Sequence, residues 1–523
     1  MTQHQIKVTF QPQDRTVYVL PGTKIIEAAA VAGIIIDTPC GGEGTCGKCK
    51  VNIISPENIK GEHLACQQTV SEDTVVNVPK TSLLLAPDKI VVDSNIIQEI
   101  IPDRKCAGIK VCFGIAVDIG TTTLAVSLIN LKDGTEVAVM GSPNPQISFG
   151  DDVVSRIKHA STGNKALSNL QKTVIRQINA MIDNLCEQGG IKRENIYEIS
   201  VAGNTVMEHL FCGIDPSPLG QLPFEPLWRG ASSIKASELN ININPEGIIY
   251  VFPVIGGFVG GDITAGMLAA DLLNQPQPLL MIDIGTNGEI VLVKNGKISA
   301  ASTAAGPAFE GAGISCGMRA MAGAIEKIKF NNDCEYSVLG NIEAEGICGS
   351  ALIDIAAEFL NAGIVDITGR IIQLESLSPK LAKRIITDTN NQPAFIIDKN
   401  VKITQRDIRQ IQLAVGAIRA GINIMLKKAG LESADLKRVL VAGGFGSFIR
   451  RNHAQRIGLL PADIGHEKIS FIGNTSLTGA KLALLSMKAR EKAQAFAKKT
   501  EHIELSADID FQNEFANAMI FPA

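Results

Sequence analysis

The tetrapeptide Asp-Ile-Gly-Thr occurs twice in this 523-residue chain, at residues 118–121 and 283–286, which lie 165 residues apart. Each copy ends an apolar run and precedes a second apolar run, which predicts two paired strands with a tight turn between them. A second pattern, Val-Ala-Gly after a strand-like run, also occurs twice, at 201–203 and 441–443. The repetition in the same order indicates an internal duplication, with two similar lobes facing one another.

The residues at these turns favour phosphate binding. A strand–turn–strand with Gly and Thr at its tip presents backbone N–H groups and hydroxyls to phosphate oxygens. An Asp directly before such a glycine can hold Mg²⁺ through its water shell. One loop from each lobe could clasp a triphosphate, and the sequence Gly-Gly-Phe-Gly at 443–446 offers a flat surface to a nucleobase. A duplicated sheet that has lost its nucleotide is the structural alternative.

Four cysteines near the amino terminus have the spacing C-x5-C-x2-C-x16-C, at Cys40, Cys46, Cys49 and Cys66. Glycine reaches positive φ without steric cost, and it lets backbone N–H groups approach the sulfurs. Four glycines stand among the cysteines, namely Gly41, Gly42, Gly44 and Gly47. The pattern resembles the loop of plant- or adrenodoxin-type ferredoxins, which implies a 2Fe–2S cluster held by the four cysteines. A structural zinc site and four inert buried cysteines are the alternatives; zinc sites more often show two C-x2-C pairs.

The sequence around the cysteines predicts a small sheet wrapped around one helix. Alternating β-branched and aromatic residues predict strands at 6–10 and 16–20, and two more at 49–54 and 74–78. A helix is expected from Thr23 to Gly33. This is a β-grasp arrangement, which leaves the glycine-rich cysteine loop at the surface.

Composition excludes several classes of function. The chain carries 49 basic and 53 acidic residues, a net charge of −4, so no basic field points to nucleic acid or anionic lipid. No signal peptide and no uncharged apolar stretch of about 18 residues is evident, so we expect no membrane association. Eleven cysteines without a secretion signal favour metal binding in a reducing cytoplasm over a disulfide framework.

The duplicated region resembles the superfamily of actin, sugar-kinase and heat-shock-chaperone ATPases, which implies a two-lobed, ribonuclease-H-like fold. The resemblance implies two phosphate loops and an adenosine loop: Asp118 with Thr121, Thr122 and Thr123; Asp283 with Gly285, Thr286, Asn287 and Gly288; and Gly443, Gly444, Phe445 and Gly446. Asp262, ahead of a predicted helix, could orient an attacking water or only cap the helix. Glu289 and Glu310 are weaker candidates for the same catalytic work.

Nearly the whole chain resembles the reductive activators of corrinoid proteins. The matching stretches include CGGEGTCGKCKV, HLACQ, IAVDIGTTT, GNTVMEHL, GICGSALID and the tail HIELSADIDFQNEFANAMIFP. The resemblance implies that an inactive cobalt(II) corrinoid of a methyltransferase system is re-reduced to cobalt(I), one electron at a time, at the expense of ATP. It implies a 2Fe–2S cluster, ATP and Mg²⁺ as cofactors. A corrinoid protein and an external low-potential electron donor would be the partners.

We therefore predict a multidomain α/β and α+β protein: a ferredoxin-like domain at 1–80, a linker at 81–112, and ATPase lobes at 113–278 and 279–523. The apolar periodicity at 411–431 predicts an amphipathic core helix, and IRRNH from Ile449 is expected to be a solvated helix face. Two other functions remain open. The chain could activate a different low-potential metalloenzyme, as in radical dehydratase systems, or be a non-catalytic redox-sensing ATPase or chaperone. The sequence leaves a homodimer open.

Overall fold

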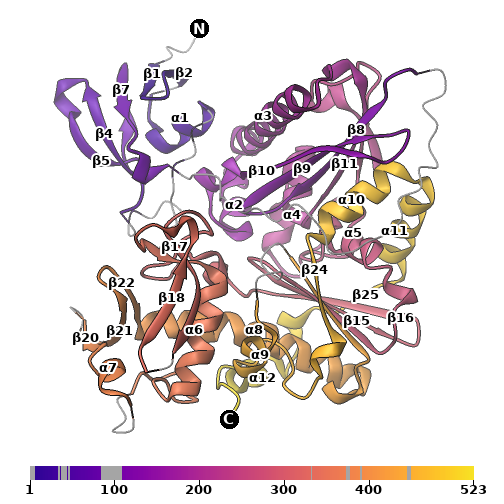
Figure 1. Ribbon diagram of the computed structural model, residues 1–523. Coiled ribbons are helices and arrows are strands. Elements are labelled where there is room, and N and C mark those ends of the chain that lie inside the picture. Colours follow the sequence, from indigo (N-terminus) through magenta and orange to yellow (C-terminus); the bar gives the residue numbers. More distant parts are fainter. Residues whose placement is uncertain are drawn as a thin grey trace. The chain divides into compact units, whose positions relative to one another are not determined.

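The computed structural model divides into two compact units, which are described separately (Figure 1). Unit 1 comprises Met1–Ala86, Ile100–Gly261 and Ala483–Arg490, and unit 2 comprises the remainder. The structure describes residues 6–19, 21–32, 34, 36, 44, 47–83, 109–330, 332–372, 377–388, 391–443 and 449–523. Within these ranges, no helix combines the length and the apolar character that a membrane crossing requires.

The amino-terminal part of unit 1 is a five-stranded sheet in the order β2-β1-β7-β4-β5. β1 and β2 form an antiparallel hairpin, β1 pairs in parallel with β7, and β4 is antiparallel to both of its neighbours. Helix α1 (Ile25–Val31) contributes buried apolar side chains to the same core as β1 and β4. The strands are β1 (Ile6–Gln11), β2 (Arg15–Val19), β4 (Lys50–Ser55), β5 (Gly61–Leu64) and β7 (Thr74–Asn77). A short pair, β3 (Thr23–Lys24) and β6 (Thr69–Val70), completes the predicted β-grasp fold.

The second part of unit 1 is a six-stranded sheet in the order β10-β9-β8-β11-β13-β12. β8 is antiparallel to β9 and parallel to β11, and almost all of its side chains are buried. The strands are β8 (Phe113–Ile119), β9 (Thr123–Asn130), β10 (Glu136–Pro143), β11 (Ile196–Gly203), β12 (Ser232–Lys235) and β13 (Ile248–Val251). The long helix α3 (Asn164–Gly189) packs on β9 and β10, and α2 (Val153–Ala160) and α4 (Thr205–Cys212) pack against α3.

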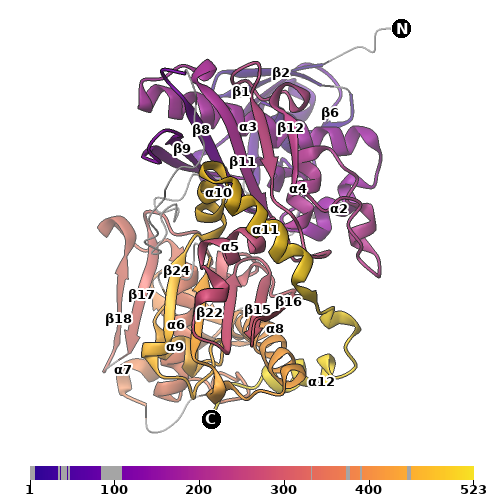
Figure 2. The ribbon, with the colours of Figure 1, turned by 90° about the vertical axis from the view of Figure 1, so that its right-hand side faces the viewer.

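Unit 2 repeats this design. Its six-stranded sheet has the order β24-β23-β14-β15-β16-β25, and helix α8 (Gln405–Ala429) packs on β15 and β16 (Figure 2). The strands are β14 (Leu279–Ile284), β15 (Gly288–Lys294), β16 (Lys297–Thr303), β23 (Arg438–Ala442), β24 (Ile469–Gly473) and β25 (Glu501–His502). The order β16-β15-β14-β23-β24 matches β10-β9-β8-β11-β13 strand for strand, with the same parallel and antiparallel pairs. The predicted duplication is therefore confirmed.

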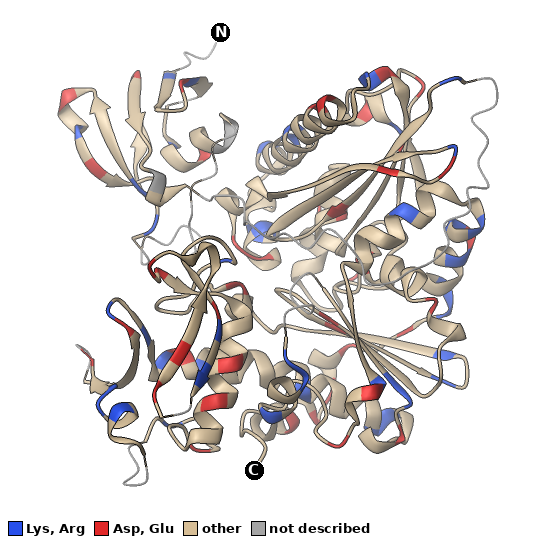
Figure 3. Cartoon of the chain, in the orientation of Figure 1, with Lys and Arg blue, Asp and Glu red and all other residues tan. Residues whose placement is uncertain are grey.

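Two small antiparallel-rich sheets lie between β16 and α8 in the chain. One has the order β18-β17-β19 and the other β20-β21-β22, and helix α6 (Gly349–Ala362) packs on β17. Their strands are β17 (Ala324–Phe330), β18 (Cys334–Val338), β19 (Gly346–Ile347), β20 (Ile385–Thr387), β21 (Pro393–Asp398) and β22 (Val401–Thr404), with a short α7 (Pro379–Ala382). Acidic and basic residues are interspersed along the described chain (Figure 3).

The carboxyl-terminal helices complete both units. α10 (Thr475–Leu485) and α11 (Met487–Lys499) leave unit 2 and return to it, because residues 483–490 belong to unit 1. Arg490 holds residues 483–490 against the rest of unit 1. Its Nη2 lies 2.6 Å from Glu198 Oε1, and its guanidinium stacks on the Tyr250 ring at 4.4 Å. Helices α5 (Gly261–Ala269), α9 (Arg451–Arg456) and α12 (Phe511–Ala518) are the remaining α-helices of the described chain.

Candidate functional site

Two of the four predicted cluster cysteines lie side by side in the ferredoxin-like sheet. Cys49 precedes β4 and Cys66 follows β5, and these strands pair antiparallel, so the two residues meet at one end of the ladder. The Ala65 N–H donates to the Cys49 carbonyl at 2.9 Å, and the two Sγ atoms are 3.3 Å apart. Both side chains are buried. Cys40 and Cys46 lie outside the described residues.

This cysteine pair suits one metal ion. The two sulfurs are not joined in a disulfide, because 3.3 Å is far beyond the roughly 2.05 Å of an S–S bond. Two thiolates on one tetrahedral metal at about 2.3 Å stand about 3.8 Å apart, so a small adjustment brings this pair to ligand spacing. Gly44 and Gly47 have φ values of +79° and +66°, as we predicted for glycines that fold the chain around a metal centre.

The first predicted phosphate loop connects β8 to β9. Asp118 lies half-buried near the end of β8, and the Gly120 N–H donates to the Thr123 carbonyl at 2.9 Å, which closes a tight turn. A Cβ on Gly120 would stand 2.7 Å from that carbonyl oxygen, so only glycine fits. Thr121 is buried at 6% exposure, whereas Thr122 and Thr123 are half-buried.

The carbonyl oxygens of this loop face protein donors. Asn144 donates through Nδ2 to the Gly120 carbonyl and through its backbone N–H to the Thr122 carbonyl, both at 2.8 Å. Arg156, a fully buried residue of α2, donates through Nη2 to the Thr121 carbonyl at 2.5 Å. The C=O and N–H groups of a trans peptide point in opposite directions. Because the loop carbonyls point toward Asn144 and Arg156, the N–H groups of the same peptides point away from these two residues.

The amino terminus of α4 supports the same loop and a second segment. Asn204 caps α4 by accepting the Met207 N–H at 3.0 Å, and its Nδ2 donates to Thr121 Oγ1 at 2.9 Å. Since Thr121 Oγ1 already accepts this bond, its own proton is free to be donated elsewhere. Thr205 Oγ1 donates to the Gly256 carbonyl at 2.8 Å, and a Cβ on Gly260 would stand 2.5 Å from Asn204 Cα. The glycines before Asp262 thus allow close packing on α4.

The second predicted phosphate loop, between β14 and β15, gathers carboxylates within unit 2. Asp283 pairs directly across the ladder with Glu289, so their side chains share one face. Burial raises the pKa of Glu289 well above its usual value, and the charges of Asp262 and Asp283 raise it further. The Gly285 N–H donates to the Asn287 carbonyl at 3.0 Å, and Thr286 Oγ1 donates to Glu310 Oε1 at 2.5 Å.

Of the residues predicted to contact adenosine, the structure describes only Gly443, which lies close to Asp283. Gly443 directly follows β23 with a φ of +95°, and its N–H donates to the Gly473 carbonyl at 3.0 Å. A Cβ at this position would stand 2.8 Å from Asp283 Oδ1 and 2.6 Å from the Ile284 carbonyl oxygen. Only glycine therefore lets the two strand ends meet. Gly444, Phe445 and Gly446 lie outside the described residues.

Three family models together match most of the chain. They are described as a 2Fe-2S iron-sulfur cluster binding domain (residues 8–71), the RACo middle region (113–275) and the C-terminal domain of RACo, the ASKHA domain (277–523). The corrinoid activation enzyme RamQ of Eubacterium limosum is 32% identical over 99% of both chains. The chain belongs to the family of reductive activators of corrinoid proteins.

Two further relatives of this activator agree. The [Co(II) methylated amine-specific corrinoid protein] reductase of Methanosarcina barkeri is 29% identical over 77% of this chain and 75% of its own. A solved structure described as a reductive activator for corrinoid, iron-sulfur protein matches with a TM-score of 0.72 and 33% identity, over 99% of this chain and 98% of that one. The predicted family and fold class are confirmed, and all four predicted ligand cysteines lie within the 2Fe–2S domain match.

Sequence reasoning missed the residues that back the activator's loops. Asn204 stands within GNTVMEHL, a stretch that carried the resemblance, but no role followed from it. No sequence pattern indicated a role for Asn144 or Arg156, because a single Asn or Arg outside a recognised motif is indistinguishable from an ordinary surface residue. Their contacts with the loop reach across 24 and 35 residues of sequence, respectively.

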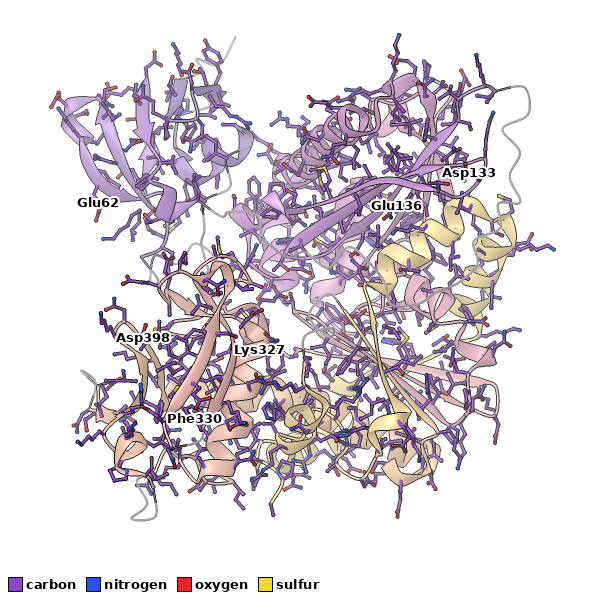
Figure 4. All side chains as sticks on the ribbon, viewed as in Figure 1. Glu62, Asp133, Glu136, Lys327, Phe330 and Asp398 are labelled. Carbon is purple, nitrogen blue, oxygen red and sulfur yellow. The ribbon has the colours of Figure 1, made fainter. Side chains whose placement is uncertain are left out.

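One prediction about the activator is wrong. IRRNH was expected to be a solvated helix face, but His453 is buried in α9 between two carboxylates of α6. His453 Nδ1 lies 2.6 Å from Asp354 Oδ1, and Nε2 lies 3.1 Å from Glu358 Oε1. Glu358 also accepts the backbone N–H of Phe330 at 2.9 Å. Phe330 is the last residue of β17 (Figure 4). The network ties α9 to α6, a contact across 99 residues that no local pattern encodes.

Proposed function

We propose that this protein is an ATP-dependent reductive activator that passes one electron from a 2Fe–2S cluster to the cobalt(II) corrinoid of a methyltransferase-system corrinoid protein, regenerating cobalt(I). The observation that carries the proposal is the end-to-end match, over 99% of both chains, to a named corrinoid activation enzyme. In this chain the matches to a 2Fe–2S domain and to an ASKHA domain lie in one polypeptide, which joins an iron–sulfur module to a nucleotide module.

The physical reason for joining the two modules is the difference between the reduction potential of the electron donor and the lower reduction potential of the cobalt(II) acceptor. A tenfold bias for one electron corresponds to about 59 mV, or about 1.4 kcal/mol. A gap of about 200 mV therefore needs about 5 kcal/mol, which a nucleotide-driven shift between two conformations can supply. In this scheme nucleotide binding and hydrolysis shift a conformational equilibrium, and the altered conformation makes the acceptor's cobalt easier to reduce.

The chain's own residues take the following roles in the proposal. Cys49 and Cys66, with Cys40 and Cys46, hold the cluster, which supplies the electron. The loops at 120–123 and 285–288 bind the phosphates through backbone N–H groups and threonine hydroxyls, and residues 443–446 contact adenosine. Asp118 and Asp283 hold Mg²⁺ through water, because hard carboxylate oxygens suit that ion. Asp262 orients the attacking water, and its charge contributes, together with burial, to the raised pKa of neighbouring Glu289.

The remaining parts of the proposal concern organisation and partners. An external low-potential donor reloads the cluster, and the protein works in the cytoplasm, where thiols stay reduced. The functional parts are a ferredoxin-like domain at 1–80, a linker at 81–112 and lobes at 113–278 and 279–523. Self-association to a homodimer is compatible with the actin-like half, and sedimentation of the anaerobic protein would measure it.

The deciding experiment uses full-length protein purified without oxygen. Iron, labile sulfide and ATP turnover are measured, and a candidate cobalt(II) corrinoid protein is then added with reductant. We expect ATP turnover to rise and a cobalt(I) absorption band to appear only when ATP is present. The variant Cys49→Ser/Cys66→Ser should lose the band and keep nucleotide binding. ATP-dependent partner binding without any cobalt(I) would instead favour a redox-sensing ATPase, and activation of a cobalt-free metalloenzyme would favour the other alternative.

A further inference from the structure

Gln67 directly follows the last cluster cysteine, and its side chain turns back toward that cysteine. The residue is exposed, yet its Nε2 lies 3.6 Å from Cys66 Sγ, within the range of an N–H···S hydrogen bond. The amide of an exposed side chain can also bond to water. Its position over the sulfur is therefore a feature that needs a reason.

The same side chain also lies close to Gly44. A Cβ on Gly44 would stand 3.0 Å from Gln67 Cγ, 3.1 Å from Cδ and 3.2 Å from Nε2. Any larger residue at position 44 would push the amide away from the sulfur. The Gln67 side chain thus lies close both to Gly44 and to the sulfur of the fourth predicted ligand, Cys66.

The backbone of the turn fixes this geometry without help from a metal. The N–H groups of Gln67 and Gln68 both donate to the Leu64 carbonyl, at 2.9 Å and 3.0 Å. Cys66 is buried at 1% exposure, and its sulfur lies 3.3 Å from that of Cys49. The hydrogen bonds of the turn and the burial of Cys66 therefore fix the position of the Gln67 amide relative to the Cys66 sulfur.

We propose that Gln67 tunes the reduction potential of the cluster by donating its side-chain N–H to the Cys66 thiolate. Hydrogen bonds to the ligand sulfurs are among the factors that set the potential of an iron–sulfur centre. Reduction adds one electron and no proton, so the negative charge on the sulfurs grows and the N–H···S bond strengthens. Gln67 therefore favours the reduced state. The inference rests on the proposed function only in that it requires the 2Fe–2S cluster.

The test is a potentiometric titration of the full-length, cluster-loaded protein, in which the electron paramagnetic resonance signal of the reduced cluster is followed. Gln67→Leu removes the donor at similar size, and Gln67→Glu replaces it with a negative charge. Gln68→Leu is the matched control, because the Gln68 amide donates to the Thr69 carbonyl instead, at 2.9 Å. At a fixed potential we expect the reduced-to-oxidised ratio of Gln67→Leu to fall about tenfold, a shift of about 59 mV to lower potential. In Gln67→Glu the reduced-to-oxidised ratio should fall further, and in Gln68→Leu the ratio should equal that of the wild type.

Three results would overturn the inference. The first is a Gln67→Leu ratio within about twofold of wild type, equivalent to about 18 mV. The second is an equal shift in Gln68→Leu, which would show a general effect of the turn. The third is loss of iron from Gln67→Leu, because the residue would then hold the ligand in place and not adjust its potential. A wild type with a normal 2Fe–2S signal but no cobalt reduction would remove the proposed function and leave this inference intact.

Discussion

Variants of Asn204 can separate its support of the proposed phosphate loop at 120–123 from its contribution to the stability of the fold. Its side chain makes two bonds with different chemistry: Oδ1 accepts the Met207 N–H as the cap of α4, and Nδ2 donates to Thr121 Oγ1. Asn204→Ala removes both bonds. Asn204→Asp keeps the cap, since a carboxylate oxygen also accepts, but it can no longer donate to the threonine.

The expected magnitudes follow from these two contacts. Loss of a helix cap costs about 1 kcal/mol, and loss of a neutral buried hydrogen bond costs about 1 kcal/mol more. For a unit of this size, about 2 kcal/mol corresponds to a fall of about 4–8 °C in Tm. Asn204→Asp should keep most of the cap contribution. Thr121 would then donate its proton to the new carboxylate and not to a phosphate. A hydrogen bond to a charged group is worth about 1.5–3 kcal/mol, so ATP affinity should fall about 10- to 100-fold.

The assay combines thermal denaturation with calorimetric titration of Mg-ATP on the same anaerobic preparations. The matched control is Ser378→Ala, which removes the Ser378 Oγ cap of α7 without touching a phosphate loop. This control should lose some stability and bind ATP normally. The reasoning is refuted if Asn204→Asp binds ATP as tightly as wild type, or if Asn204→Ala leaves Tm unchanged.

Three further changes test other parts of the structure. Arg490→Met should lower the free energy of unfolding by about 3–5 kcal/mol in urea titrations, because it removes one half of a buried ion pair with Glu198, and adding Glu198→Leu should restore most of it. Burial lowers the pKa of His209, so the stability that neutral His209 contributes is present above about pH 6.5 and is lost as the pH falls below that value, where the unfolded imidazole takes up a proton first. The urea midpoint should therefore fall less between pH 7 and pH 5 in His209→Gln than in wild type. An equal fall of the midpoint in the two proteins would contradict this. Gly443→Ala should abolish ATP turnover while leaving the cluster spectrum unchanged, because the new Cβ would meet Asp283 Oδ1; normal turnover would show that the strand ends can separate.

Several features were predictable because they are local in sequence. The strand-turn-strand pattern around each Asp-Ile-Gly-Thr follows from alternation and turn residues, and both sheets form as expected. Positive φ at Gly44 and Gly47 follows from the need to fold a chain around closely spaced ligands. The family resemblance added the order of the modules, which the matching domains confirm.

By itself, the sequence determined the duplicated sheets, the loops that connect their first strands and the spacing of the thiols. Only the tertiary structure decided which side chains stand behind those loops. Asn204 reaches Thr121 across 83 residues, and Glu289 acquires its raised pKa from burial beside Asp262 and Asp283. The physical reason is that turns and strands depend on near neighbours along the chain. Hydrogen bonds and charge interactions depend instead on distances in space, which exist only after the sheets and helices have packed.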